Sequence, residues 1–388
     1  MIDWADLAAR NAPLNAFIAF DTTATEGIGP LAGVTVGVKA NVMARGLPWS
    51  GGIGALASRV AERDAETVAQ LRAAGAAIIG ALNMEEAALG AKTDNPHFGP
   101  TQNPHRIGYS PGGSSGGSGA AVAAGLCDVA LGTDTMGSVR IPAAHCGIYG
   151  FKPAMDRVSQ DGLDPAAPRL DAIGPLARNL DLLERTSRLM TDFGGGDIAR
   201  CGFMLTGHGV SVAPEVQRCF DIAIKALGEK PAAETLEYPN SRIRFAGFIA
   251  VATCLHAHLA GVPVSERLQR LIAYGPRRSA PDRAEDAAIL ARTREQVRAM
   301  VARHGFLVMP TVPNPAFPHS EPEPAAQADF TCLANIAGLP ALSLPMGWTG
   351  DGLPLGIQIV GKQGCEAGLF ALARRIDRVM GAYRAPSS

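Results

Sequence analysis

Two glycine-rich turns that carry serines are the part of this sequence best suited to chemistry. They read Ser110-Pro-Gly-Gly-Ser-Ser-Gly-Gly-Ser118 and Gly132-Thr-Asp-Thr-Met-Gly-Ser-Val-Arg-Ile-Pro142, and Ser114 and Ser138 within them are 24 residues apart. Glycine allows close backbone approach and lets N–H groups point at a ligand. A serine on such a turn can act as a nucleophile beside its own oxyanion hole.

The second turn predicts where that oxyanion hole would form. Asp134 can bond local backbone and Gly137 permits a tight bend. The segment after Ser138 can start a short helix, whose N-terminus would add partial positive charge. We therefore expect an oxyanion to be held by backbone N–H groups of Thr135, Met136, Gly137 and Ser138.

A serine nucleophile needs a base, and Lys39 is the strongest candidate. The eight histidines are scattered and suggest no Ser-His-Asp system. Lys39 follows an apolar segment, 33–38, that predicts a strand. Two simpler interpretations remain open. Gly/Ser clusters are commonly plain loops, and a lysine after a buried strand is more often a surface residue with a buried stem. A phosphate-binding loop is disfavoured, because neither glycine-rich phosphate motif is present.

Composition narrows the possible partners and cofactors. The chain has 388 residues, 47% apolar and 18% charged, with a net charge of −1 and no basic run, so nucleic acid and membrane surfaces are not expected partners. Its seven cysteines form no Cys-x-x-Cys pair, and Cys146 has no base placed for it. His256 and His258 would face different sides of a helix, which disfavours a metal site. The N-terminus lacks the features of a signal peptide and the scattered cysteines fit a reducing compartment, so we expect a cytoplasmic protein. Acyl transfer by a serine would need no cofactor, and we expect none.

The hydrophobic pattern predicts strands and helices in alternation up to Tyr149, and therefore a sheet covered on both faces. The expected elements there are a strand at 31–38, a helix capped by Asp64, a strand at 76–79 and a helix starting at Asn83. Residues 191–300 read as a helical insertion, with helices at 218–227 and 284–303. Strands return at 306–309, 341–345 and 355–360, a proline-rich loop covers 310–324, and a helix spans 366–380.

Taken together, Lys39 and the two turns resemble the amidase signature family. Six further segments look like the family: Gly80–Glu85, Phe98–Pro104, Cys146–Pro153, Asp171–Pro175, Asn335–Pro345 and Gly356–Gln358. The resemblance is dense over 30–180 and thinner over 300–375. It implies an α/β fold with a mixed central β-sheet between helices on both faces. The whole chain, 1–388, would form one domain, with the helical insertion at 191–300 and a C-terminal sheet portion at 300–388.

The resemblance also implies roles for individual residues. Ser138 would be the nucleophile, Ser114 a bridging serine after a cis peptide bond at Gly113, and Lys39 the base. Burial lowers the pKa of a lysine from its reference value of about 10.4, which would supply the neutral amine that this role needs.

The residues around these three are expected to support the turns. Ser115 and Thr135 would hydrogen-bond nearby, while Asp134 and Arg140 would brace the loops. An alternative role for Arg140 is to bind a substrate carboxylate.

Two residues depart from the family pattern. Ala40 replaces the usual aspartate beside the base, and Met136 replaces the usual glycine in the oxyanion turn. We expect Met136 to influence the size of the substrate, provided that its backbone does not need a positive φ. Residues 155–170 also drift from the pattern, so the substrate cannot be transferred from relatives.

The leading functional hypothesis is hydrolysis of a small carboxamide, carbamoyl or urea-like substrate. One alternative is the glutaminase subunit of a tRNA-dependent amidotransferase, although the compact length and lack of basic patches argue against it. Another is a non-catalytic binding protein descended from amidases. The family resemblance implies a homodimer, and a further option is that the chain binds a small accessory subunit.

Overall fold

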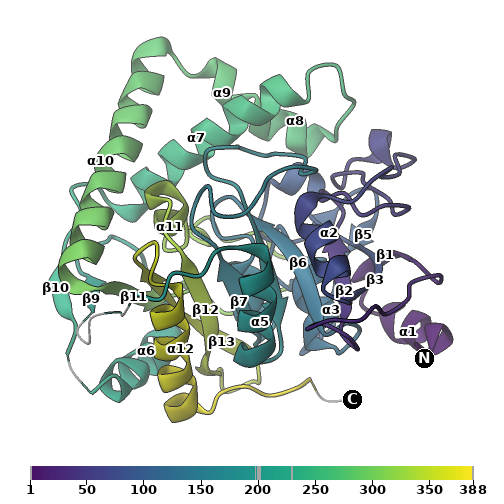
Figure 1. The fold of residues 1–388 in the computed structure, drawn as a ribbon. Helices are drawn as coiled ribbons and strands as arrows, with labels where there is room; N and C mark the ends of the chain where they lie inside the picture. Colours follow the sequence, from purple (N-terminus) through teal and green to yellow (C-terminus); the bar gives the residue numbers. More distant parts are fainter. Residues whose placement is uncertain (1, 197, 199–201, 229, 387–388) are drawn as a thin grey trace.

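The computed structural model describes residues 2–196, 198, 202–228 and 230–386. In this part of the chain, a mixed sheet of eleven strands runs through the molecule (Figure 1). Strands from residues 17–177 and from residues 306–361 lie side by side in it. From one edge to the other the strands are β1 (Phe17–Phe20), β3 (Ala77–Leu82), β2 (Thr35–Lys39), β6 (Val129–Asp134), β8 (Ala172–Ala177), β7 (Tyr149–Lys152), β12 (Ala341–Trp348), β13 (Pro354–Gly361), β11 (Phe306–Pro310), β9 (Phe203–Leu205) and β10 (Ala232–Glu234).

Helices cover both faces of this sheet. On one face lie α3 (Gly116–Ala123) and α4 (Arg140–His145), and near them α1 (Trp4–Asn11). On the other lie α2 (Glu66–Ala73), α5 (Leu180–Met190), α6 (Pro214–Ala226) and α12 (Glu366–Met380). Strand residues alternate between the two cores, as a sheet buried on both faces requires: Val129 and Leu131 join one core and Ala130 the other. The predicted fold class is confirmed.

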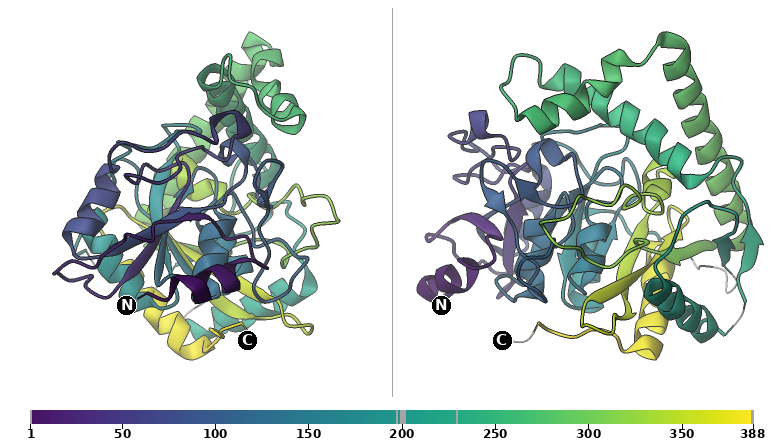
Figure 2. Two further views of the ribbon diagram at one scale, coloured as in Figure 1. Left: turned by 90° about the vertical axis from the view of Figure 1, so that its right-hand side faces the viewer. Right: turned by 180° about the vertical axis from the view of Figure 1, so that it is seen from behind.

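A separate layer of helices stands over one end of the sheet, at the top of Figure 1 and again in both views of Figure 2. It has its own apolar core, which includes Ile243, Leu255, Val297 and Leu333. None of the described helices is long and apolar enough to cross a membrane. The layer consists of α7 (Asn240–His258), α8 (Glu266–Ile272), α9 (Tyr274–Arg277), α10 (Ala280–His304) and α11 (Cys332–Ala337).

The segment 191–300 is less purely helical than its sequence predicts. It contributes β9 and β10, which pair in parallel and extend the sheet beyond β11. Both strands have three residues, shorter than the usual strand pattern, so no periodicity announces them. The helices predicted at 218–227 and 284–303 are confirmed as α6 and α10, each beginning earlier at a proline-containing first turn.

Two helices predicted in the N-terminal region begin differently in the structure. The helix expected from Asn83 is a short 3₁₀ turn, Glu86–Ala88, in which Ala87 and Ala88 have φ of 51° and 57°. A left-handed backbone cannot continue a helix. The helix expected to be capped by Asp64 begins at Glu66 without a side-chain cap, because the Asp64 carboxylate accepts from the Arg45 N–H and Arg72 Nε instead.

A small hairpin, β4 (Asp94–Asn95) with β5 (Gly99–Pro100), and a 3₁₀ turn at Gly54–Leu56 complete the N-terminal region. The C-terminal predictions agree well with the structure. Strands β11, β12 and β13 cover the three predicted segments, and α12 has the predicted bounds. The proline-rich segment 311–324 is irregular, yet it is not wholly at the surface, since Val312 and Phe317 are buried.

Candidate active site

Lys39 ends β2 and is completely buried. Its Nζ lies 2.7 Å from Ser114 Oγ and 2.8 Å from Thr133 Oγ1. Strands β2 and β6 run in parallel with Val38 opposite Leu131, so the ends of both strands, and hence Lys39 and Thr133, meet at one edge of the sheet. Sequence reasoning did not single out Thr133. A signal that could have found it is its place at the end of an apolar strand, just before Asp134.

Burial changes the acid–base behaviour of Lys39. The loss of water around the amine lowers its pKa to about 7, although the carboxylates of Asp134, Asp171 and Glu85 act in the opposite direction. A pKa near neutral pH gives a substantial fraction of uncharged amine, which a general base requires.

Ser114 is held by the backbone on both sides. The bond between Gly113 and Ser114 is cis, as expected. A Cβ on Gly113 would lie 2.8 Å from backbone atoms of Ala91 and Lys92, so only glycine fits there. The carbonyl of Ser114 accepts from the Glu85 N–H at 3.1 Å. These contacts fix the hydroxyl of Ser114 against Lys39.

Ser115 joins the first turn to the strand that leads into the second. Its Oγ donates to the carbonyl of Thr133 at 3.2 Å and lies 3.3 Å from the Thr133 N–H. The two turns are therefore positioned relative to each other by a buried side chain.

Asp134 organises the second turn. Its carboxylate accepts from the N–H groups of Gly137 at 2.7 Å and Val139 at 3.2 Å, and from Arg140 Nε and Nη2 at 3.0 Å each. Burial by itself would raise the pKa of Asp134, but the adjacent Arg140 guanidinium holds it at about 2. The carboxylate is thus ionised and saturated with hydrogen bonds.

Arg140 lies inside the protein and not in a binding surface. Its side chain is completely buried and donates to Gln358 Oε1 at 2.8 Å and Asn335 Oδ1 at 2.6 Å, in addition to Asp134. The alternative role considered for it, binding of a substrate carboxylate, does not fit this position. Asn335 and Gln358 lie in the two C-terminal segments that resemble the family, and their contact with Arg140 explains why those segments matter to the turn.

The oxyanion turn differs from the expectation at one residue. The N–H of Gly137 is occupied by Asp134, so Gly137 is not available to an oxyanion. Within the described residues, the N–H groups of Thr135, Met136 and Ser138 have no hydrogen-bond partner. Met136 does not have a positive φ, which was the condition for its N–H to serve.

The glycine at 137 has a steric reason. Its φ is +136°, and a Cβ would lie 2.2 Å from Thr331 Oγ1. Thr331 in turn donates to the Met136 carbonyl at 2.6 Å, and Thr135 Oγ1 donates to Asp171 at 2.6 Å. The whole turn is thereby held by side chains from other segments.

Ser138 opens onto a cavity of about 660 Å³, whereas Lys39 and Ser114 are sealed from solvent. The cavity wall combines the second turn with the helical layer and with the loop before α11. It is lined by Ala88, Leu89, Gly90, Ala91, Thr135, Met136, Ser138, Ile141, Arg244, Phe245, Phe248, Val251, Arg267, Arg270, Leu271, Tyr274, Glu323, Ala325, Gln327 and Ala328.

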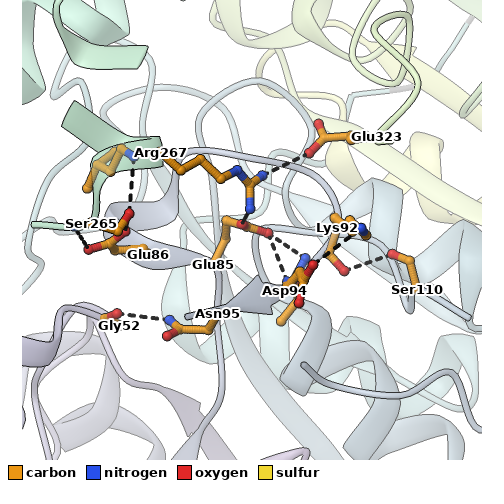
Figure 3. A network of polar contacts seen from close by, with 12 residues as sticks. Gly52, Glu85, Glu86, Lys92, Asp94, Asn95, Ser110, Ser265, Arg267 and Glu323 are labelled. Atoms are coloured by element: carbon orange, nitrogen blue, oxygen red, sulfur yellow. Dashed lines mark hydrogen bonds and ion pairs between the residues drawn. The ribbon is translucent and has the colours of Figure 1, made fainter. Parts of the chain in front are cut away.

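A polar network fastens the helical layer to the first turn (Figure 3). Arg267 of α8 donates to Glu85 at 2.7 Å and lies 3.5 Å from Glu323. Glu85 also accepts from the Thr93 N–H, and Glu86 accepts from Ser265 at the start of α8. Burial and the nearby Glu85 raise the pKa of Glu323 to about 7. The network therefore links one cavity wall to the backbone of Ser114.

The described residues contain no group of three or more side chains arranged to hold a metal ion. His256 and His258 lie near the C-terminal end of α7, away from the two turns in sequence and outside the lining of the cavity. The groups that β2 and the two turns bring together are hydroxyls, one amine and backbone N–H groups.

Comparisons with known proteins point in one direction. The model of the amidase family matches residues 4–192 and 198–370. The chain is 34% identical to a glutamyl-tRNA(Gln) amidotransferase subunit of Methanosarcina barkeri, covering 90% of this chain and 85% of that protein. It is 35% identical to the corresponding subunit of Natronomonas pharaonis, covering 92% and 98% respectively.

Solved structures agree. The glutamyl-tRNA(Gln) amidotransferase subunit of Thermotoga maritima superposes with a TM-score of 0.86 at 27% identity, covering 99% of this chain and 93% of that one. A chain from a vestigial protein complex, described as revealing the evolutionary origins of an s-triazine catabolic enzyme, superposes with a TM-score of 0.88 at 27% identity, covering 99% and 95%. The match of the family model over almost the whole length, with relatives above 30% identity, shows that this chain belongs to the amidase signature family.

Proposed function

We propose that this protein is an amide hydrolase that forms an acyl-enzyme at Ser138. The observation that carries the proposal is the buried contact of 2.7 Å between Lys39 Nζ and Ser114 Oγ, beside a turn whose serine opens onto a cavity. A lysine with a pKa of about 7 supplies the base. In the first step Ser138 Oγ attacks the amide carbonyl, its proton passes to Ser114, and Ser114 passes its own proton to Lys39.

The negative charge that develops on the substrate oxygen would be held by N–H groups of the second turn that have no other partner, those of Thr135, Met136 and Ser138. When the tetrahedral intermediate collapses, the Lys39 ammonium returns a proton through Ser114 to the leaving nitrogen. Ammonia or an amine departs. Water then attacks the ester at Ser138, and its proton passes through Ser114 to Lys39. When this second intermediate collapses, Lys39 returns the proton through Ser114 to Ser138 Oγ, which releases the carboxylic acid and restores the serine.

The cavity favours a small-molecule amide with an apolar part. Phe245, Phe248 and Tyr274 form an aromatic wall, with Phe248 and Tyr274 edge to face at 5.7 Å between ring centroids. Such surfaces gain most from burying apolar area of a ligand. This supports hydrolysis of a carboxamide, carbamoyl or urea-like substrate by the chain itself.

A second candidate is the glutaminase subunit of a tRNA-dependent amidotransferase. The comparisons favour it over the first, because eight curated relatives with 31–35% identity are all named as the same subunit of glutamyl-tRNA(Gln) amidotransferase. In that role glutamine would be the amide cleaved, and partner subunits would be needed. The same triad of Lys39, Ser114 and Ser138 would perform the chemistry, so the two candidates differ in substrate and assembly.

The test is to measure ammonia released from a panel of amides by the purified chain, with glutamine among them and with Ser138→Ala in parallel. Hydroxylamine should divert the acyl group to a hydroxamate in the wild type. We expect Ser138→Ala to lower the rate by at least about 10⁴-fold, as loss of a serine nucleophile does elsewhere. Ser118→Ala is a matched control, because the hydroxyl of that buried serine of the first turn donates to the Leu131 carbonyl and, within the described part of the chain, has no contact with Lys39 or Ser114.

The outcomes separate the candidates. Release of ammonia from apolar amides by the chain alone supports the first. Cleavage of glutamine that appears only with co-purified partner subunits supports the second. Hydrolysis that survives Ser138→Ala would contradict the mechanism in both.

A further inference from the structure

The buried amine of Lys39 lies between two hydroxyl groups, and the proposed proton route uses one of them. Its Nζ is 2.7 Å from Ser114 Oγ and 2.8 Å from Thr133 Oγ1. Within the described part of the chain, these two oxygens are the hydrogen-bond partners of that nitrogen. Ser114 relays the proton, whereas Thr133 contacts the same amine and has no assigned role.

The way the amine is turned decides whether Lys39 can act as a base. A neutral amine has two N–H bonds and one lone pair, and a hydroxyl can donate as well as accept. To take the proton of Ser114, the lone pair must face Ser114 Oγ, so that an N–H faces Thr133 Oγ1. In the opposite arrangement the Thr133 hydroxyl donates to the lone pair, and Lys39 cannot accept from Ser114.

The surroundings of Thr133 Oγ1 suit the first arrangement. Once Lys39 is protonated it has three N–H bonds and no lone pair, so Thr133 can only accept from it. Asn41 Nδ2 also donates to Thr133 Oγ1, at 3.2 Å, and the two lone pairs of a hydroxyl oxygen can serve both donors. The arrangement that fits the ammonium therefore also fits the reactive neutral amine. Thr133 need not turn as the proton passes between Ser114 and Lys39.

The position of the Thr133 hydroxyl is fixed by the strand that carries it. Thr133 lies in β6 opposite Ile173 of β8, and it is 2% exposed. Its carbonyl accepts from Ser115 Oγ at 3.2 Å, and its N–H lies 3.3 Å from the same oxygen. A β-branched side chain has few rotamers available to it. The acceptor beside Lys39 is thus held in one place by the backbone of the sheet.

We propose that Thr133 is a positioning residue for the base: its hydroxyl oxygen accepts an N–H of Lys39 and so points the lone pair of the amine at Ser114 Oγ. Thr133 is not among the residues that line the cavity, so it would act on the substrate only through Lys39. This inference rests on the proposed amide hydrolysis and adds a residue to its proton route.

The first experiment compares Thr133→Val, which keeps the shape of the side chain, with Thr133→Ser, which keeps the hydroxyl. We expect Thr133→Val to lower kcat by about tenfold and to leave KM unchanged, because the amine is no longer held toward Ser114 while the cavity is intact. Thr133→Ser should recover most of the loss. A Thr133→Val enzyme with the kcat of the wild type would overturn the inference.

The pH profile distinguishes positioning from a structural role. A hydrogen bond from a charged donor is stronger than one from a neutral donor, so Thr133 stabilises the ammonium of Lys39 more than the amine. Its removal should lower the pKa of Lys39, which is about 7 in the wild type. The rise of kcat/KM with pH should then move about one unit lower in Thr133→Val and not in Thr133→Ser.

Thr311→Val is the matched control for this profile. Thr311 is buried, and its Oγ1 is 2.8 Å from Ser343 Oγ, so the variant also loses a buried hydroxyl contact, but one outside the triad. It should lower the Tm and keep the pH profile of the wild type. If Thr133→Val likewise lowered the Tm and left the profile in place, Thr133 would be structural and the inference would be wrong.

A measurement without turnover separates this inference from the proposed function. In Ser138→Ala, the NMR signal of the Lys39 amine nitrogen, assigned by its absence in Lys39→Met, reports protonation of the base directly. Adding Thr133→Val should lower the midpoint of this titration by about one pH unit. Equal midpoints would overturn the inference. A wild type that releases ammonia from no amide would instead count against the proposed function.

Discussion

Polar groups are bonded to the protein in the second turn but less so in the cavity wall opposite to it, which includes Tyr274 and Gln327. Around Asp134 and Arg140 each charged atom has at least one protein partner and no exposure. Across the cavity, Gln327 has none among the described residues, and Tyr274 is 51% exposed. A saturated network holds reacting groups in one geometry, which bond-making requires. Accessible aromatic rings offer apolar area that a ligand can cover. Under the proposed function, the second turn would carry the chemistry and the wall opposite would contact the substrate.

Among the changes that test this comparison, removal of the proposed base should have the largest effect. Lys39→Met keeps a buried chain of similar length, and we expect it to lower amide hydrolysis by at least about 10³-fold, as loss of a general base does. In the wild type, kcat/KM should rise with pH through about 7, because only the neutral amine accepts a proton. A Lys39→Met enzyme that retained this rise would contradict the assignment.

Lys152 provides the matched control. It is the other buried lysine whose pKa burial lowers to about 7, and its ammonium donates to the Pro153 carbonyl outside the triad. Both lysines have a folded pKa below the unfolded value of 10.5, so the unfolded chain binds more protons between pH 7 and 10.5. The free energy of unfolding should therefore increase with pH in that window, by up to about 1.4 kcal/mol per pH unit for each lysine. Urea unfolding at pH 7 and 9 should show that the increase in the free energy of unfolding is smaller by one lysine's contribution in both Lys39→Met and Lys152→Met. Only Lys39→Met should also lower amide hydrolysis by about 10³-fold.

A smaller effect is expected from crowding the saturated turn. Gly137→Ala would bring a Cβ to within 2.2 Å of Thr331 Oγ1, which should displace the N–H groups beside Ser138 and lower kcat by about 10²-fold. Gly46→Ala has a positive φ of 83° with nothing within 4 Å, so it controls for backbone conformation alone. Equal activity of the two variants would show that the second turn tolerates movement and is no more rigid than the wall opposite to it.

The smallest effect should come from Met136, a side chain that belongs to both regions. Met136 lies in the turn and lines the cavity, and its Cε is 2.9 Å from where a Cβ of Gly247 would stand. Met136→Gly should raise kcat/KM for bulky amides relative to small ones by about tenfold, because it opens space without removing a backbone N–H. Rates for acetamide and for a branched or aryl amide measure the ratio. An unchanged ratio would show that Met136 does not set substrate size.

Local sequence determined the parts of this protein that depend on neighbouring residues. The strands that end at Lys39 and Asp134, the turn at Gly113 and Ser114, and the helix that starts at Arg140 follow from short patterns of apolar, glycine and polar residues. The family resemblance carried by these motifs then placed three reactive groups together. These features are readable because apolar periodicity, glycine clusters and helix-starting segments are local properties of the sequence.

The tertiary structure decided what depends on segments far apart. Thr133 contacts Lys39 because two strands run in parallel, and Gly137 lost its expected role because Asp134 takes its N–H. The sequence around Asn83 suggests a helix, but buried Glu85 bonds to Arg267, 182 residues away, and the chain turns left-handed just beyond it. Nothing near Gln327 in sequence shows that its amide is without a partner, because the partners of a buried group are set by the segments that pack against it.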